Sequence, residues 1–415
     1  MGVNTPNIRF KGFTDDWEQC KLSTLCENIT VGIANSATHA YRDNGIVMFR
    51  NQNIKENYLD DSDIIYIDEE FEKRYINKRL KANDLLIART GYPGTACVVP
   101  AKYEGSQTFT TLIARLKTGT NPFFVCQYIN SDYGKSYITA TQIGGGQKNS
   151  GAGILEQFPM ALPPTLDEQI TIAEFLTKLD ETVTLHQRKC DEVKELKKYM
   201  LQKMFPQEGQ SVPEIRFDGF TDDWEQRKLN EYLEVSRIKN KDEVYGKEDV
   251  LSVSGDNGIV NQIEFQGRSF AGVSVAPYGV VETGDVVYTK SPLKSNPYGI
   301  IKTNKGKPGI VSTLYAVYKP LENVYSEFVQ IYFEQDARMN NYMHPLVNKG
   351  AKNDMKVSAE NALKGEVCFP NRDEQINISE YFAKLDNLIT LHQRKCDEMK
   401  ELKKYMLQNM FPQKG

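Results

Sequence analysis

Two long stretches of this chain occur twice, about 206 residues apart. Pro6 to Ser23 returns as Pro213 to Asn230, with 14 of 18 positions identical. Asp167 to Pro206 returns as Asp373 to Pro412, with 30 of 40 positions identical. Such a repeat indicates a duplicated architecture, so a fold proposed for one half must also hold for the other.

We call the repeated blocks the frame, and the divergent segments between them the first and second insert. The inserts, Cys26 to Thr165 and Leu233 to Arg372, share only short local similarities. One is the pair of segments NDLLIAR and GDVVYTK, which end at Arg89 and Lys290. A constant frame around unlike inserts is expected when the frame contacts one symmetric partner and the inserts recognise two different targets.

The composition is that of a folded globular protein, with 40% hydrophobic and 26% charged residues. For 415 residues, roughly 100 to 200 residues per domain suggests two to four units. We divide the chain into 1–165, the first frame segment with the first insert, and 166–206, a central helix. The copy gives 207–372, the second frame segment with the second insert, and 373–412, a distal helix.

The sequence carries no recognisable membrane or export signal. No apolar run approaches the roughly 18 residues that span a bilayer, and the segment Met1 to Phe13 lacks the basic and apolar regions of a secretory signal. We therefore expect a cytoplasmic protein. The seven cysteines form no CxxC pair, which favours reduced thiols over a zinc ribbon or a disulfide framework.

The charge of the chain limits how it can bind nucleic acid. The net charge is −4, whereas many nucleic-acid binders are basic because neutralising phosphates drives their affinity. Glu27 to Met160 holds 14 basic and 14 acidic residues, and Leu233 to Glu366 holds 16 of each. Any contact with DNA must therefore come from a local patch or rely on a partner.

The second block of the frame predicts one long helix in each half. Its apolar residues recur at alternating steps of four and three, which is the spacing of a coiled coil. Neither copy contains Pro or Gly before its last residue, so each fits a helix of about 38 residues, roughly 57 Å long at 1.5 Å per residue. Lys197 interrupts the apolar row in the first copy, and Lys403 does so in the second.

A long helix with one apolar stripe must pack against another element to be stable. Its own copy is the nearest candidate, and a pseudo-twofold axis would make the pair antiparallel. Two unrelated core helices in separate domains remain the alternative. The residues predicted to pair the helices are Leu176, Leu179, Val183 and Val193 in the first copy and Phe382, Leu385, Ile389 and Met399 in the second.

Both inserts have the pattern of compact α+β units of about 140 residues. Short β-branched runs separated by Gly, Pro and Asn predict strands, for example at Leu85 to Ala88 and Leu314 to Tyr318. Short helices are predicted at Phe123 to Ser131 and Glu327 to Asp336. The predicted fold class is therefore α+β, with two globular α/β units joined by a pair of long antiparallel coiled-coil-like helices and related by a pseudo-twofold repeat.

Catalytic and metal-binding motifs are weak. His186 with Cys190, and His392 with Cys396, could each supply two metal ligands, but they lie in the apolar seam, so packing is the simpler interpretation and no metal site is predicted. The tetrad NPFF from Asn121 to Phe124 is similar to the NPPF tetrad of adenine methyltransferases, but no glycine-rich cofactor loop accompanies it. A helix-start turn explains this tetrad, and no catalytic residue is predicted.

Basic and amide side chains in the inserts are the candidates for contacting DNA. Gln and Asn can make bidentate contacts to adenine, while Lys and Arg can hold phosphates or base edges. Two glycine-containing turns, GQKN and KGAKN, combine these residue types. The predicted DNA-binding residues are Arg89, Gln147, Lys148 and Asn149 in the first insert and Lys290, Lys349, Lys352 and Asn353 in the second.

The order of motifs along the chain resembles one family throughout its length. The motifs are FTDDWEQ followed by KL, a D-[IL]-L-I-x-R-like segment, a G-x-x-K-N turn, PP-x-x-DEQ, and a long helix with KLD, HQRK, KKYMLQ and MFP. This pattern resembles the specificity subunit of type I restriction-modification systems. The frame matches the conserved regions of that family, and the inserts match its two target-recognition domains.

The resemblance implies a division of labour between this chain and its partners. In this family each target-recognition domain reads one half of a bipartite, asymmetric site in double-stranded DNA, and the paired helices set the spacer. Two methyltransferase subunits dock on the frame, and motor-nuclease subunits complete the complex. S-adenosylmethionine, ATP and Mg²⁺ are expected on those partners, with no cofactor on this chain.

Two other classes of function remain as alternatives. A coiled-coil scaffold whose inserts bind proteins would share the long helices, but it leaves the difference between the inserts unexplained. A self-sufficient DNA methyltransferase or nuclease would need cofactor and catalytic motifs that the sequence lacks.

Overall fold

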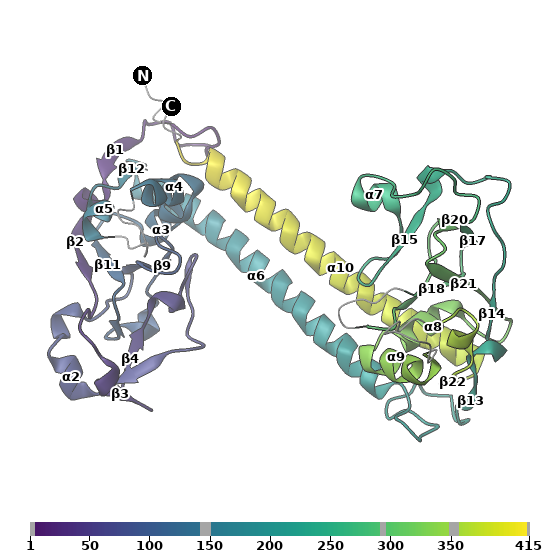
Figure 1. The fold of residues 1–415 in the computed structure, drawn as a ribbon. Coiled ribbons are helices and arrows are strands. Elements are labelled where there is room, and N and C mark those ends of the chain that lie inside the picture. The colour runs from purple at the N-terminus through teal and green to yellow at the C-terminus, as the bar shows by residue number, and fades with distance from the viewer. Residues whose placement is uncertain (1–4, 142–150, 291–295, 348–356, 413–415) are drawn as a thin grey trace. The chain divides into compact units, whose positions relative to one another are not determined.

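The fold is that of a computed structural model, which describes residues 5–141, 151–290, 296–347 and 357–412 (Figure 1). The chain forms two compact units, which we call unit 1 and unit 2. Unit 1 comprises Met1–Arg188 with His392–Gly415, and unit 2 comprises Lys189–Leu391. Among the described residues, no helix is long and apolar enough to cross a membrane.

The two long helices predicted from the repeat are present, each with 38 residues: α6 (Leu166–Lys203) and α10 (Arg372–Asn409). Two acidic residues lie in the first turn of each helix, where they interact favourably with the positive end of the helix dipole. Each helix contributes one part to unit 1 and the other part to unit 2.

The first insert is built around a four-stranded antiparallel sheet in the order β2-β11-β8-β9. Its strands are β2 (Cys26–Val31), β11 (Leu112–Leu116), β8 (Leu85–Ile87) and β9 (Ala96–Val98). Two helices follow, α3 (Pro122–Asn130) and α4 (Asp132–Ala140). A second sheet, in the order β10-β4-β7-β3, consists of β10 (Gln107–Thr108), β4 (Ile46–Phe49), β7 (Ile65–Ile67) and β3 (Tyr41–Arg42).

The second insert repeats the first sheet in the order β14-β21-β18-β19. Its strands are β14 (Leu233–Val235), β21 (Tyr315–Pro320), β18 (Val286–Thr289) and β19 (Ile301–Thr303). Two helices follow again, α8 (Ser326–Tyr332) and α9 (Asp336–Met343). The remaining strands form the pairs β15 (Leu251–Ser254) with β16 (Gly258–Asn261), and β17 (Gly279–Val281) with β20 (Gly309–Val311).

The predicted α+β class is confirmed, and the two inserts share a sheet although their sequences differ. The strands predicted at Leu85 to Ala88 and Leu314 to Tyr318 correspond to β8 and β21. The helix predicted over Glu327 to Asp336 is interrupted, because α8 ends at Tyr332 and α9 begins at Asp336.

The similarity between NDLLIAR and GDVVYTK has a structural cause. Asp84 and Asp285 are buried at the start of equivalent strands, and each follows a residue with positive φ. Asp84 pairs with Arg115 at 2.7 Å, and Asp285 pairs with Lys319 at 2.8 Å. Each acid therefore closes a turn and is neutralised by a basic residue on the neighbouring strand, as a buried charge requires.

In each unit, a strand of the frame pairs with the last strand of the insert to form a short two-stranded ribbon. In unit 1, β1 (Glu18–Lys21) pairs antiparallel with β12 (Pro159–Leu162). In unit 2, β13 (Glu225–Lys228) pairs antiparallel with β22 (Glu366–Phe369). Each ribbon therefore joins the end of the first frame block of that half to the strand that leads into a long helix.

A buried ion pair fastens the frame to the start of each long helix. Glu168 is 1% exposed, and its carboxylate accepts hydrogen bonds from Nε and Nη2 of Arg9 at 2.7 and 2.8 Å. Arg216 and Glu374 repeat the pair at 2.8 Å for both contacts. Trp17 also donates its indole N–H to Glu168 at 3.2 Å. The hydrogen bond and charge of Glu168 raise the pKa of Arg9, although burial opposes this.

The next residue of each helix holds the insert. The Gln169 side chain accepts the backbone N–H of Asn121, at the start of α3, at 2.9 Å. The Gln375 side chain accepts the N–H of Tyr325, just before α8, at 2.8 Å. The repeated DEQ motif therefore joins frame, insert and helix in each unit.

The C-terminal end of one long helix completes the aromatic core of each unit. In unit 1, the Phe411 ring lies 4.8 Å from Tyr128, 5.6 Å from Phe124 and 6.5 Å from Trp17, between ring centroids. In unit 2, the Phe205 ring lies against the equivalent rings Trp224, Phe328 and Tyr332. Phe411 follows α10 and Phe205 follows α6, so the repeat explains this exchange.

The helix segments within each unit run antiparallel (Figure 1). In unit 1, Asp180 of α6 forms an ion pair with Lys403 of α10. The Cys396 thiol of α10 lies 3.8 Å from the backbone carbonyl of Val183 in α6. In unit 2, Lys197 contacts Asp386 at 2.6 Å. Residues with higher numbers in α6 contact residues with lower numbers in α10. The predicted antiparallel pairing therefore holds within each unit.

The lysines that interrupt the apolar seam are ion-paired. Lys197 is mostly buried and bonds Glu334 and Asp386, both at 2.6 Å. Burial alone lowers the pKa of Lys197, but the two carboxylates outweigh burial and raise it. In unit 1, Lys403 pairs with Asp180, which also accepts the side-chain amide of Gln127 at 2.8 Å.

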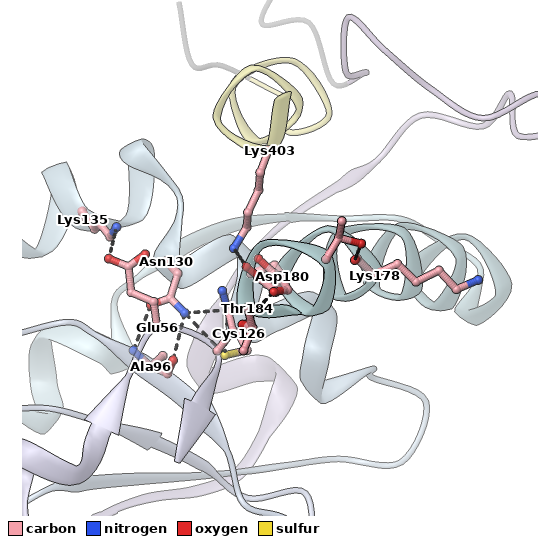
Figure 2. A network of polar contacts seen from close by, with 12 residues as sticks. Glu56, Ala96, Cys126, Asn130, Lys135, Lys178, Asp180, Thr184 and Lys403 are labelled. Atoms are coloured by element: carbon pink, nitrogen blue, oxygen red, sulfur yellow. Dashed lines mark hydrogen bonds and ion pairs between the residues drawn. The ribbon is translucent and has the colours of Figure 1, made fainter. Parts of the chain in front are cut away.

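Figure 2 shows the surroundings of Lys403 and Asp180 in unit 1. Nearby on α3, Asn130 both donates to and accepts from the backbone of Ala96, at 2.9 Å for each bond. The amide therefore takes the place of a neighbouring strand along this part of β9, which satisfies backbone groups that would otherwise be buried unpaired. These contacts link the helix pair to the sheet of the first insert.

We predict that Glu168→Gln destabilises unit 1 by about 3–5 kcal/mol, the usual cost of removing one partner of a buried ion pair. The loss arises because Arg9 stays buried beside a neutral amide. Urea denaturation followed by tryptophan fluorescence measures it. Each unit holds one tryptophan, Trp17 or Trp224, so a Trp224→Phe background reports on unit 1 alone.

Glu181→Gln is the matched control, because Glu181 is an exposed carboxylate on the same helix. It should leave the urea midpoint of unit 1 unchanged. Equal midpoints for Glu168→Gln and Glu181→Gln would show that the ion pair does not fasten the frame.

A second prediction concerns the seam. Lys403→Met leaves Asp180 without its cation and should lower the free energy of unfolding of unit 1 by about 1–3 kcal/mol. Adding Asp180→Leu should restore part of the loss, since it removes the unpaired carboxylate but also leaves the buried Gln127 amide without its acceptor. The same urea experiment tests both, with the exposed Lys404→Met as control. A double variant less stable than Lys403→Met would contradict this account.

Candidate nucleic-acid interface

The two predicted contact residues that the structure describes lie at equivalent positions. Arg89 follows β8, and Lys290 follows β18. The backbone N–H of Arg89 donates to Asn51 at 2.7 Å, and the Lys290 ammonium donates to the carbonyl of Thr313 at 3.0 Å. Burial, together with Lys239, lowers the pKa of Lys290. Their contact with DNA stays a prediction.

The other six predicted contact residues lie outside the described residues. They are Gln147, Lys148, Asn149, Lys349, Lys352 and Asn353. Their proposed role stays a prediction.

Unit 1 has a half-open hollow of about 700 Å³ that begins one residue after Arg89. Its walls come from residues 50–56, from the β8–β9 loop and from residues 109–110. Asn51 links these walls, because its side-chain oxygen accepts the N–H of Arg89 and its amide donates to Thr110 at 3.1 Å. The lining of the hollow is therefore held together by a polar side chain that also contacts the backbone of a predicted contact residue.

One acid holds two polar side chains at the rim of this hollow. Asp63 accepts the Arg50 guanidinium at 2.9 Å and the Gln52 amide at 2.6 Å. Arg50 also donates to the Asp63 carbonyl at 3.0 Å. Gln52 is exposed, so its amide group is both oriented and accessible.

An aromatic ring projects from the β8–β9 loop beside the same hollow. Tyr92 is 85% exposed. Two backbone hydrogen bonds close the base of the loop. The N–H of Gly94 donates to the carbonyl of Ala88, and the N–H of Ala88 donates to the carbonyl of Thr95, both at 2.9 Å. Gly94 has φ +91°, and a Cβ there would lie 2.9 Å from Ile138. An ordered loop therefore presents an exposed aromatic ring.

Unit 2 offers a different surface. Its hollow of about 910 Å³ lies between α6, the β15–β16 turn and residues 302–305. Lys302 is 8% exposed there, and burial lowers its pKa. Among the described residues it donates to no acceptor, but Glu334 and Asp386 lie close enough to oppose the effect of burial. Lysines and carboxylates alternate around this hollow, so it presents no surface of a single sign.

The eight predicted helix-pairing residues divide between the two units. Leu176, Leu179 and Met399 pack in the core of unit 1, and Val193, Phe382 and Leu385 pack in the core of unit 2. Val183 and Ile389 contribute carbonyls to the contacts between the helices. Several residues expected only to pair the helices therefore also belong to the cores of the inserts, which the heptad pattern does not reveal.

The repeated histidines meet each other in the seam. The Nδ1 atoms of His186 and His392 lie 3.0 Å apart. The Cys396 thiol points instead to the Val183 carbonyl at 3.8 Å and to Gln187 at 3.6 Å. Within the described residues, no group of three or more His, Cys, Asp or Glu side chains is arranged to hold a metal ion.

The NPFF tetrad forms a helix start. The Asn121 side chain accepts the N–H of Phe124 at 2.9 Å and caps α3, with Pro122 in its first turn. Its backbone N–H is held by Gln169. This geometry accounts for the tetrad without a methyltransferase site.

Sequence reasoning missed the cluster of Arg50, Gln52, Asp63 and Tyr92. The segment GYPG at Gly91 to Gly94 is a turn signal with an aromatic residue between strands, and it could have singled out Tyr92. Nothing in the sequence indicates that Asp63 bonds Arg50 and Gln52, because these contacts depend on how residues 53–62 fold.

Comparisons with known proteins agree on one family. A sequence model described as the type I restriction modification DNA specificity domain matches residues 14–195. The MjaX specificity subunit of a type I restriction enzyme from Methanocaldococcus jannaschii is 22% identical, over 95% of this chain and 92% of that protein. The MjaVIII specificity subunit from the same organism is 23% identical over 66% of each chain.

A solved structure shares the fold. The S subunit of a type I restriction-modification system from M. genitalium superposes with a TM-score of 0.63 and 13% identity, covering 99% of this chain and 100% of that one. In the second half, the two frame blocks repeat those of residues 14–195, while the second insert has a different sequence. Together, the matched domain and the full-length relative indicate a type I restriction-modification specificity subunit.

Proposed function

We propose that each insert reads one half of a bipartite, asymmetric site in double-stranded DNA. The observation that carries this proposal is that the two inserts share one sheet topology but differ in sequence and surface. A common scaffold with different rims is suited to reading two different sequences, because base readout depends on a few side chains while the scaffold sets their position.

The long helices set the spacer between the two half-sites in this proposal. Support comes from their length and from the ion pairs of Lys197 and Lys403, which fix the register of the helix segments within each unit. A helix rises 1.5 Å per residue, so a fixed register gives a fixed separation. The frame would then act as a ruler.

Two methyltransferase subunits dock on the frame, and motor-nuclease subunits join through them. Exposed apolar residues on the helices are repeated by the duplication and support two equivalent docking sites. Unit 1 exposes Leu185 and Tyr405, and unit 2 exposes their copies Leu391 and Tyr199. Large exposed apolar side chains on a repeated surface are typical of binding sites.

Chemistry belongs to the partners in this proposal. S-adenosylmethionine binds the methyltransferase subunits, and ATP with Mg²⁺ binds the motor-nuclease subunits, while this chain supplies recognition alone. The complex would act on DNA in the cytoplasm.

The first test is to express the chain with a cognate methyltransferase subunit in a host that lacks adenine methylation. We expect the two proteins to copurify, and single-molecule sequencing to find methylated adenines in one bipartite motif with a fixed spacer. Exchanging residues 26–165 for the same segment of another family member should change one half of the motif and keep the other.

The control for this exchange is the reciprocal replacement of residues 233–372, which should change the opposite half. A soluble, copurifying complex that methylates no motif would favour the scaffold function instead. A motif that changes in both halves after one exchange would contradict the assignment of one half-site to each insert.

A separate prediction tests the ruler. Val183→Asp with Ile389→Asp places charges in both halves of the seam, while the residues of the two insert cores stay intact. We expect a lost or altered spacer in the methylated motif, with the bases of both half-sites unchanged. Leu179 and Leu385 are less suitable positions, because each is buried in the core of an insert.

Glu181→Gln with Glu195→Gln serves as the matched control, since both carboxylates are exposed on α6. It should keep the original spacer. If the complex of the Val183→Asp, Ile389→Asp variant keeps the original spacer, the paired helices do not set its length.

A further inference from the structure

We propose that Gln52 and Tyr92 read bases in the half-site recognised by unit 1, with Gln52 contacting an adenine and Tyr92 packing on the neighbouring nucleotide. This inference rests on the proposed function and assigns the reading residues of one insert. The hollow between residues 50–56 and the β8–β9 loop receives the edge of the base pair.

Asp63 gives Gln52 a defined orientation. Its carboxylate holds one hydrogen of the Gln52 amide at 2.6 Å, which leaves the second amide hydrogen and the side-chain oxygen for a ligand. Those two groups match the N7 acceptor and N6 donor that adenine presents in the major groove. An exposed glutamine normally samples many rotamers, so this restraint lowers the entropy lost on binding.

Arg50 keeps Asp63 in place. Its guanidinium bonds both the carboxylate and the carbonyl of Asp63, at 2.9 and 3.0 Å. These two bonds hold the Arg50 guanidinium against Asp63, so Arg50 supports the acid. Arg50 and Asp63 are thus positioning residues, and Gln52 is the reading residue.

Tyr92 faces solvent on a loop that is otherwise tightly bonded. Its ring makes no aromatic contact in the described part of the chain. Gly91 and Gly94 have φ of +77° and +91°, which favours glycine and fixes the turn that projects the ring. Apolar and aromatic side chains contact the thymine methyl group in the major groove, so Tyr92 would add affinity next to the base that Gln52 discriminates.

Basic residues lie at or near the hollow, although Lys55 also lies 4.0 Å from the carboxylate of Asp60. Lys55 lines the hollow and Arg89 precedes the Tyr92 loop, whereas Glu56 is engaged by Lys135 at 2.6 Å. Cations at the rim can contact phosphates, which position the duplex without reading its sequence. The neutral amide and ring at the centre can then contact bases.

The experiment uses the complete complex of this chain with its methyltransferase subunit. Motifs are mapped by single-molecule sequencing, and discrimination is measured by competition with duplexes altered at each base pair. We expect Gln52→Ala to relax one A·T position in one half-site, with discrimination at that position falling roughly 5- to 150-fold, the range that one bidentate contact supplies. All positions of the other half-site should be unchanged.

Variants of the support separate positioning from folding. Asp63→Ala should weaken discrimination at the same base pair as Gln52→Ala, while Asp63→Asn, which keeps an acceptor for Gln52, should restore part of it. Tyr92→Ala should weaken binding to the cognate duplex, whereas Tyr92→Phe should bind like the wild type.

Tyr58→Ala is the matched control, because Tyr58 is also exposed in the first insert but does not line the hollow. It should bind and discriminate as the wild type does. Trp17 fluorescence in the Trp224→Phe background should show that the variants of Gln52, Asp63, Tyr92 and Tyr58 unfold at the wild-type urea concentration.

Each result bears on the proposal. A wild-type motif with unchanged discrimination in Gln52→Ala and unchanged affinity in Tyr92→Ala overturns this inference and leaves the proposed function standing. Loss of discrimination spread over all positions of both half-sites also overturns it. A wild-type complex that methylates no bipartite motif overturns the proposed function, and this inference with it.

Discussion

A buried carboxylate at the start of each long helix sets the relation between helix, frame and insert. Glu168 binds Arg9 and Trp17 of the frame, and Glu374 binds Arg216 of the copy. A buried charge demands its partner at short range, so neither frame segment can shift along its helix without exposing an unpaired charge to the core. The glutamine that follows each acid applies the same constraint to the insert.

The repeat and the heptad spacing were sufficient to predict two long antiparallel helices and two α+β inserts. They predicted less well what the polar residues of the frame do, because polar side chains carry no periodicity. In the sequence, Lys197 only interrupts the apolar row. In the structure it forms ion pairs with Glu334 and Asp386. The role of Glu168 depends on Arg9, 159 residues away, and no local pattern encodes such a contact.

The candidate recognition surface was predictable only in part. Arg89 and Lys290 lie in the local similarity between NDLLIAR and GDVVYTK. The structure explains this similarity by the buried Asp84 and Asp285, which precede them. The surface around Gln52 has no counterpart in the repeat, because it is built on the strands and turns in which the inserts differ. Residues that a duplication keeps are thus informative about the scaffold, and residues that it changes are informative about the target.

The exchange of helix ends also governs the order in which the chain can mature on the ribosome. Unit 2 uses only residues 189–391, whereas the aromatic core of unit 1 needs Phe411. At about 5–20 residues per second, the segment from Phe205 to Phe411 takes roughly 10 to 40 s to synthesise. The part of the protein made first is therefore completed last. During this interval the aromatic core around Trp17 lacks Phe411.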